Sequence, residues 1–273
     1  MNPDWLIPKW PAPPHVKAVF TSRGISETGF ANKIGASQPP FDTFNLGDHV
    51  GDDPAHVMAN RRMLQTQIGA KPVYMKQVHG AEVATLTPKT PDGTVADACI
   101  TTEKKLACTI MVADCLPVFF SDVEGSFVAA AHAGWRGLVD GVLRENIRSI
   151  NAIDGVNVAY CASKRIAWLG PCIGPEAFEV GGEVKVVFEA SLPNSAAMFK
   201  PVGGSDSGKW LADLAGLARL QLNQLGLGED KIFGNDGGVD WCTVSNPSRY
   251  FSHRRDAVKL GSSGRMAGCI WLV

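Results

Sequence analysis

The stretches ACTIMVADCLPVFFSD (residues 107–122) and SFVAAAHAG (residues 126–134) are apolar along nearly their whole length. Both are rich in strand-favouring residues, and apolar side chains occupy odd and even positions alike. This pattern is typical of strands that are buried on both faces in a central sheet. On either side, strand-like segments alternate with helix-like ones, without an internal repeat or a long linker. The sequence therefore predicts an α/β fold of packed layers, with mixed β-sheets and flanking helices.

The remaining segments divide into strands and helices by their hydrophobic spacing. Strands are expected within residues 72–80, 82–87, 96–102, 165–174 and 264–273. Helices are expected within residues 52–69, 136–153, 175–190 and 210–228. In the first of these helices, Asp53 and Pro54 suit a helix start and Gly69 suits a helix end. The order of the strands does not follow from the sequence.

Length and composition favour one globular unit. The chain has 273 residues, of which 45% are hydrophobic and 19% are charged, so it can bury a sizeable core. Residues 1–16 hold five prolines and are expected to form an extended N-terminal arm, either packed on the body or paired with a partner chain. Residues 17–273 are expected to form a single domain.

Net charge, cysteine content and the absence of long apolar runs indicate which partners and which location to expect. The net charge is −1 and the lysines and arginines are scattered, so we expect a small-molecule partner and neither nucleic acid nor an anionic membrane. The seven cysteines include no C-x-x-C pair and are expected to be free thiols. The sequence has no secretory leader pattern and no run of about 18 apolar residues, so a cytoplasmic location is expected. The oligomeric state does not follow from these features.

Three metal-capable side chains lie where apolar strands end: His79 in KQVHG, Cys115 in VADCLPV and His132 in AAAHAGWRG. Strand ends commonly hold reacting groups in α/β proteins, because the sheet fixes the side chain while the next loop admits substrate. Two imidazoles and one thiolate would hold zinc and leave a fourth position for water or substrate, as in catalytic zinc sites. His253, in SHRRD, is a reserve ligand.

The glycines around Arg136 predict a sharp turn into a helix. Gly134 and Gly137 allow the turn, and the free N–H groups at the helix start would face the same space as His132. A guanidinium beside such donors suits phosphate or another oxyanion. Pairing of Arg136 with a surface carboxylate is the alternative, and the sequence leaves both open.

With these junctions identified, the sequence resembles the YfiH-like family, whose members are described as polyphenol oxidase (laccase-domain) proteins, zinc-dependent purine nucleoside phosphorylases and peptidoglycan editing factors. The resemblance extends over nearly the whole chain. It is carried, in order, by TSRGISE, FDTFNLGDHVGDDP, NRRML, KQVHG, ADACIT, VADCLPV, HAGWRG, GPCIGPEAFEVG, FSHRRD and SGRMAGCIWL. Carried over by position, the family's zinc ligands and catalytic residues fall on His79, Cys115 and His132. Phe178 departs from the tyrosine usual at its position.

The resemblance implies a mixed α/β sandwich and a zinc enzyme that cleaves purine nucleosides with phosphate, giving free base and ribose 1-phosphate. Adenosine, inosine and methylthioadenosine would be the substrates, with adenosine deamination as a side activity. Arg136 would help to place phosphate. By position, Gln77 and Asn45 are candidates to bind purine or ribose, and Arg61 is a candidate to bind an anion.

Three other functions use the same residues or the same fold. Copper at the three ligands could give weak polyphenol oxidase activity, but six histidines without an H-x-H pair are too few for a multicopper cluster. Alternatively, Cys115 could be a nucleophile with His132 or His79 as its base, in an amide hydrolase that edits peptidoglycan precursors. A binding protein without turnover is the third alternative.

Overall fold

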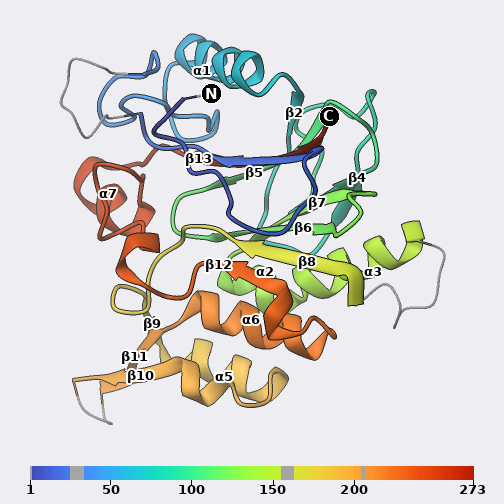
Figure 1. Ribbon diagram of the computed structural model, residues 1–273. Helices are drawn as coiled ribbons and strands as arrows, with labels where there is room; N and C mark the ends of the chain where they lie inside the picture. The colour runs from blue at the N-terminus through green and yellow to red at the C-terminus, as the bar shows by residue number, and fades with distance from the viewer. Residues whose placement is uncertain (1, 25–33, 155–162, 204–206) are drawn as a thin grey trace.

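Three β-sheets organise the computed structural model, which describes residues 2–24, 34–154, 163–203 and 207–273 (Figure 1). A six-stranded sheet has the order β12-β8-β6-β7-β4-β3. Its strands are β3 (Val83–Thr85), β4 (Ala98–Thr101), β6 (Leu116–Asp122), β7 (Val128–Ala133), β8 (Arg165–Leu169) and β12 (Ile232–Gly234). A four-stranded sheet has the order β1-β13-β5-β2 and consists of β1 (Val16–Phe20), β2 (Lys71–Tyr74), β5 (Leu106–Val112) and β13 (Met266–Leu272). The third sheet, β10-β11-β9, consists of β9 (Glu179–Gly181), β10 (Phe199–Val202) and β11 (Lys209–Ala212).

Helices cover the outer faces of the two larger sheets. The α-helices are α1 (Pro54–Ile68), α2 (Trp135–Asp140), α3 (Val142–Asp154), α5 (Gly182–Ser191), α6 (Leu214–Gln224) and α7 (His253–Leu260). Short 3₁₀ helices are η2 (Ser195–Met198), η4 (Glu229–Lys231) and η5 (Val239–Trp241). Figure 1 shows α1 above the four-stranded sheet and α2, α3, α5 and α6 below the six-stranded one. The layer order is therefore helix, sheet, sheet, helix.

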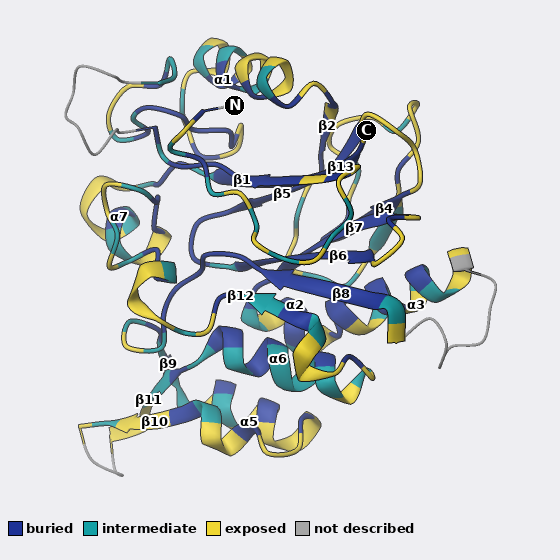
Figure 2. Ribbon diagram, in the orientation of Figure 1, coloured by how far each residue is buried: buried dark blue, intermediate teal, exposed yellow. Residues whose placement is uncertain are grey.

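Alternate side chains of the central strands enter different cores, which explains why these strands are apolar at every position. In β7, Val128 and Ala130 pack between the two sheets, while Ala129 and Ala131 pack against the helices below. Strand β13 likewise sends Ile270 between the sheets and its neighbours towards α1. Figure 2 shows β6, β7 and β8 buried throughout. The predicted mixed α/β fold is confirmed, since the larger sheets combine parallel and antiparallel pairs.

The predicted elements agree with the structure most closely where capping signals were present. Helix α1 begins after Asp53, whose side chain accepts a hydrogen bond from the Ala55 N–H, and ends at Gly69 in the left-handed conformation.

The helix predicted over residues 136–153 is interrupted, because Gly141 has a φ of 90° and separates α2 from α3. A left-handed residue ends the regular helical hydrogen bonding at that position.

Two predicted helices were wrong at their N-terminal ends. The segment expected to be helical over residues 175–190 begins with a turn and then strand β9, and the segment over residues 210–228 begins within strand β11. The two strands pair with Val180 opposite Trp210. Helix α6 starts only after Asp213, whose carboxylate accepts the Gly216 N–H. Strand pairing between distant segments therefore replaces the helical turn that the local spacing predicted. The strand predicted over residues 72–80 also ends early, at Tyr74.

Described residues of the N-terminal arm lie against the body. The Trp5 side chain is buried, and Leu6 exchanges two backbone hydrogen bonds of 2.9 and 2.8 Å with Phe20. The division at residues 16 and 17 stays a prediction. Within the described parts of the chain, every helix is too short or too polar to cross a bilayer.

Candidate metal centre

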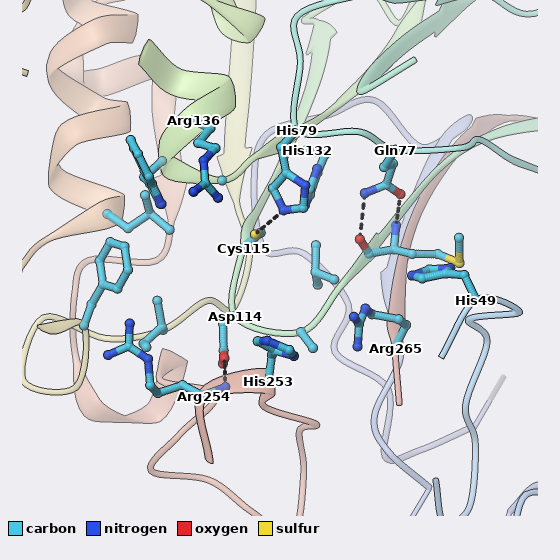
Figure 3. A pocket seen from close by; sticks show the side chains of 18 residues that line it. His49, Gln77, His79, Asp114, Cys115, His132, Arg136, His253, Arg254 and Arg265 are labelled. Atoms are coloured by element: carbon cyan, nitrogen blue, oxygen red, sulfur yellow. Dashed lines mark hydrogen bonds between the residues drawn. The ribbon is translucent and has the colours of Figure 1, made fainter. Parts of the chain in front are cut away.

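His79, Cys115 and His132 converge on one point (Figure 3). One ligand atom from each residue lies within 4.8 Å of the other two. The Cys115 Sγ is 3.7 Å from the His79 Nε2, and the two imidazole centroids are 4.7 Å apart. The structure therefore brings together the three residues that the sequence singled out.

The register of β6 and β7 brings Cys115 next to the turn that follows His132. Strands β6 and β7 pair antiparallel with Leu116 opposite Ala133, so Cys115, one residue before β6, lies against Gly134. A Cβ added to Gly134 would be 2.9 Å from the Cys115 Sγ and 3.2 Å from the His79 Cδ2. Only glycine leaves room there for both side chains.

Asp97 orients both histidines from behind. This fully buried residue precedes β4, and its carboxylate accepts the His132 Nδ1–H at 2.8 Å. The same carboxylate accepts the backbone N–H groups of residues 78–80, each at 2.9 Å. These bonds hold His79 at a φ of 62°, a left-handed conformation that is rare for histidine. Because Asp97 takes the Nδ1–H of His132, the Nε2 of that ring is left to bind a ligand.

The charges of the site favour a thiolate. Burial raises the pKa of Cys115, but the positive charge of His132 and hydrogen bonds from His132 and His79 outweigh burial and lower the pKa to about 6. Burial lowers the pKa of His132, but the Cys115 thiolate and the Asp97 carboxylate raise it to about 9. Burial also raises the pKa of Asp97, while its bonds to His132 and to backbone N–H groups lower it below its usual value.

The separation of Cys115 from His79 fits a tetrahedral metal ion. Zinc–sulfur and zinc–nitrogen bonds of about 2.3 and 2.1 Å at a tetrahedral angle would separate sulfur from nitrogen by about 3.6 Å. The observed separation between Cys115 and His79 is 3.7 Å. The His132 ring also has the buried carboxylate partner that metal-binding histidines commonly have. This group could therefore hold a metal ion.

A cavity of about 390 Å³ opens in front of the three ligands. Its lining includes apolar and aromatic side chains, among them Trp135, Ile173, Phe178 and Leu214. Cationic or basic side chains form much of the rest: His49, Arg136, His253, Arg254 and Arg265. The cavity is thus suited to a ligand with a flat apolar part and an anionic part.

Asp114 is the one carboxylate among the side chains lining this cavity, and it is fully engaged. Its oxygens accept hydrogen bonds from the Thr243 hydroxyl at 2.5 Å, the Ser252 hydroxyl at 3.1 Å and the Arg254 N–H at 2.7 Å. Asp114 therefore fastens the start of α7, with His253 and Arg254, beside the turn that carries Cys115.

Of the residues predicted to bind substrate, two line the cavity and two lie outside its lining. Arg136 lines it, exposed and stacked on the Trp135 ring at 4.6 Å. Gln77 also lines it, but its amide makes two 2.8 Å hydrogen bonds to the Met111 backbone. The reserve ligand His253 lines the cavity without joining the three-ligand group.

Asn45 and Arg61 lie outside the lining. Asn45 is fully buried, and its amide bonds to Gly47, Asp52 and the Arg265 N–H. Arg61 pairs with Asp48 at 3.2 Å and covers the Tyr74 ring at 3.9 Å. The binding roles predicted for both residues stay predictions.

Sequence reasoning missed Asp97, Asp114 and Arg265. The signal for the two aspartates was present, because each interrupts an apolar strand run, in ADACIT and VADCLPV. A buried carboxylate in such a run requires hydrogen-bond partners, and it commonly marks a site. No comparable local signal distinguishes Arg265 in SGRMAG.

Comparisons with known proteins support a close family relationship. Residues 28–273 match the family model described as multi-copper polyphenol oxidoreductase laccase. A purine nucleoside phosphorylase of Pseudomonas aeruginosa is 42% identical over 268 residues, covering 98% of each chain. The purine nucleoside phosphorylase YfiH of Escherichia coli is 42% identical over 270 residues, also covering 98% of each chain.

Solved structures show the same fold. The crystal structure of a Neisseria meningitidis protein has a TM-score of 0.82 at 41% identity, covering 98% of this chain and 99% of the other. That of Bacillus licheniformis YfiH has a TM-score of 0.82 at 27% identity, covering 94% and 93%. By sequence and by structure, this chain belongs to the family described as multi-copper polyphenol oxidoreductase laccase, which includes the YfiH proteins.

Proposed function

We propose that this protein is a zinc-dependent purine nucleoside phosphorylase. The observation that carries the proposal is the His79–Cys115–His132 group in a cavity that is lined by both aromatic and cationic side chains. Relatives that are 42% identical over nearly the whole chain bear the name purine nucleoside phosphorylase. The proposed substrates are adenosine, inosine and methylthioadenosine, each cleaved with phosphate to the free base and the sugar 1-phosphate. The sugar product is ribose 1-phosphate from adenosine and inosine, and 5-methylthioribose 1-phosphate from methylthioadenosine. The partners are thus nucleoside and phosphate, in the cytoplasmic setting that the sequence predicts.

Different side chains of the cavity suit the purine base and the phosphate. The rings of Trp135 and Phe178 and the side chain of Leu214 offer apolar surface for a purine base, and the arginines offer charge for phosphate. In the reaction a phosphate oxygen bonds to ribose C1′ as the C1′–N9 bond breaks. The base leaves with the electron pair and takes up a proton. Arg136, at the rim, is proposed to assist in placing phosphate.

Zinc is the proposed ion because two imidazoles and a thiolate with one open position are typical of catalytic zinc. Bound there, it would supply Lewis acidity and a fixed positive charge. Copper is an alternative occupant of the same ligands. In the described ranges, however, the three residues are the one group of metal-capable side chains, whereas a multicopper oxidase needs several such groups. Adenosine deamination is proposed as a side activity of the same site.

A second candidate is a thiol-dependent amide hydrolase. The observation in its favour is the low pKa of Cys115, about 6, beside a positively charged His132. Without metal, such a thiolate–imidazolium pair resembles an activated nucleophile with its acid–base partner. Activity that survives complete removal of metal would favour this candidate.

Product analysis with inosine tests the phosphorylase proposal. We expect hypoxanthine and ribose 1-phosphate in equal amounts, with release of base that requires phosphate. Omitting phosphate is the matched control, and base release should then stop. Free ribose as the sugar product, or release that does not depend on phosphate, would contradict phosphorolysis and indicate a hydrolase.

A further inference from the structure

Arg265 is a partly buried cation whose charge has no carboxylate partner among the described residues. Its Nη1 donates to the Ser263 and Gly264 carbonyl oxygens at 2.7 and 3.1 Å. Its Nε and Nη2 make no hydrogen bond within the described ranges, and the residue lines the cavity. Burial lowers the pKa of Arg265, and the nearby Cys115 and Asp114 partly offset this effect. A desolvated guanidinium with free donors is a favourable place for an anion.

The other arginines of the cavity are more exposed or already engaged. Both terminal nitrogens of Arg254 donate to the Glu179 carbonyl oxygen at 3.0 Å, and the residue is exposed. Arg136 is exposed and stacked on Trp135. Figure 3 shows Arg136 and Arg265 on opposite sides of Cys115. Arg265 is therefore the best-placed inner cation, on the side of Cys115 away from Arg136 and the Trp135 ring that Arg136 covers.

The backbone around Arg265 is built to hold its side chain in place. The Arg265 N–H donates to the Asn45 Oδ1 at 2.8 Å, and Asn45 is itself fully buried. Gly47 lets the side chain pass close by, since an added Cβ there would lie 2.7 Å from the Arg265 Cγ. Asn45 and Gly47 thus act as positioning residues for the guanidinium.

We propose that Arg265 forms the phosphate subsite of the cavity, with His49 beside it. The proposal rests on the proposed phosphorylase function and specifies where its anionic co-substrate binds. Asp114 acts on Arg265 only through its charge, without an ion pair among the described residues, and its carboxylate oxygens accept hydrogen bonds from Thr243, Ser252 and the Arg254 N–H. Phosphate bound at Arg265 would leave the rings of Trp135 and Phe178 free for the purine.

Direct binding of inorganic phosphate to the zinc-loaded protein, without nucleoside, tests the subsite. By calorimetry, Arg265→Gln should weaken phosphate binding about tenfold or more, since it removes charge-assisted hydrogen bonds. Arg265→Lys keeps the charge but loses the fork, so its loss should be smaller. Arg62→Gln removes one charge from the exposed face of α1 and should change phosphate affinity less than about twofold.

A second variant, Gly47→Ala, tests the same subsite in case Arg265→Gln does not fold. Gly47→Ala keeps the guanidinium but crowds its Cγ, so it should weaken phosphate binding as well. In turnover assays, Arg265→Gln should raise the KM for phosphate about tenfold or more and leave the KM for inosine within about threefold. Unchanged phosphate affinity in folded, zinc-loaded Arg265→Gln would overturn the subsite, as would unchanged affinity in Gly47→Ala if Arg265→Gln does not fold.

The proposed phosphorylase function and the proposed phosphate subsite can be contradicted independently of each other. If the wild-type protein binds phosphate through Arg265 but does not cleave nucleosides, the subsite stands and the phosphorylase function falls. If phosphorolysis occurs and Arg265→Gln leaves the phosphate KM unchanged, the function stands and the subsite falls.

Discussion

Asp97 shows how one buried side chain can determine a site. Its carboxylate accepts hydrogen bonds from His132 Nδ1 and from the three N–H groups of residues 78–80. It therefore fixes the ring of one ligand and the backbone of another. A neutral amide cannot accept all of these bonds, because one of its two ends is a donor.

We predict that Asp97→Asn weakens zinc binding about 10–100-fold while the three ligands remain. Competition with a chromophoric zinc chelator measures the loss. Asp230→Asn, at an exposed aspartate in η4, is the control and should bind zinc like the wild type. Wild-type affinity in Asp97→Asn would show that the carboxylate does not orient His132.

The pKa of Cys115, about 6, predicts its reactivity in metal-free protein. The thiolate fraction should rise with pH through about 6 and then level off, because the lowered pKa leaves the thiol ionised at neutral pH. An ordinary thiol would stay mostly protonated until pH values near 9. Alkylation by iodoacetamide, followed by mass mapping of the Cys115 peptide, measures the profile. A midpoint above about pH 8 would contradict the thiolate–imidazolium pair.

At the scale of elements, the register of β6 and β7 brings Cys115 against Gly134. The Gly134 backbone has a φ of −67°, so alanine is tolerated conformationally and only space forbids it. We predict that Gly134→Ala displaces the Cys115 and His79 side chains and lowers zinc content without removing a ligand. Elemental analysis of the purified protein measures this.

The matched control for Gly134→Ala is Gly182→Ala, at the start of α5. An added Cβ there has its nearest neighbour at 3.6 Å, an ordinary contact. That variant should retain wild-type zinc. Full zinc content in Gly134→Ala would mean that the ligand positions can shift to accept the methyl group.

Local signals predicted some elements well and others poorly. Helix α1 and strands β5, β6, β7 and β13 carry their caps or their uninterrupted apolar runs in the sequence itself. Strands β9 and β11 could not be separated from the helices that follow them, because Val180 and Trp210 become strand residues only through pairing with each other. Such pairing is a long-range event that helical spacing does not encode.

At the scale of the whole molecule, the fold gathers distant segments around one cavity. The ligands come from loops and strand ends of both larger sheets, and α7 with the start of β13 closes the opposite side. The three metal ligands could be recognised because the sequence predicts each at the junction of an apolar strand and a loop. The structure confirms this for Cys115, one residue before β6, and for His132, near the end of β7, whereas β2 ends at Tyr74 and leaves His79 in the following loop. Arg265 could not be recognised, because its position depends on a contact with Asn45 across the fold.

We propose that His79, Cys115 and His132 together hold one metal ion on which activity depends. Zinc content and phosphorolysis of inosine, measured on the same preparations before and after chelation, test it most directly. We predict about one zinc per chain, loss of both zinc and activity on chelation or in Cys115→Ala, and retention of both in Cys269→Ala, whose thiol is buried in β13 away from the cavity. Protein that phosphorolyses inosine at the wild-type rate without bound metal, or a Cys115→Ala variant that keeps its zinc, would contradict the account.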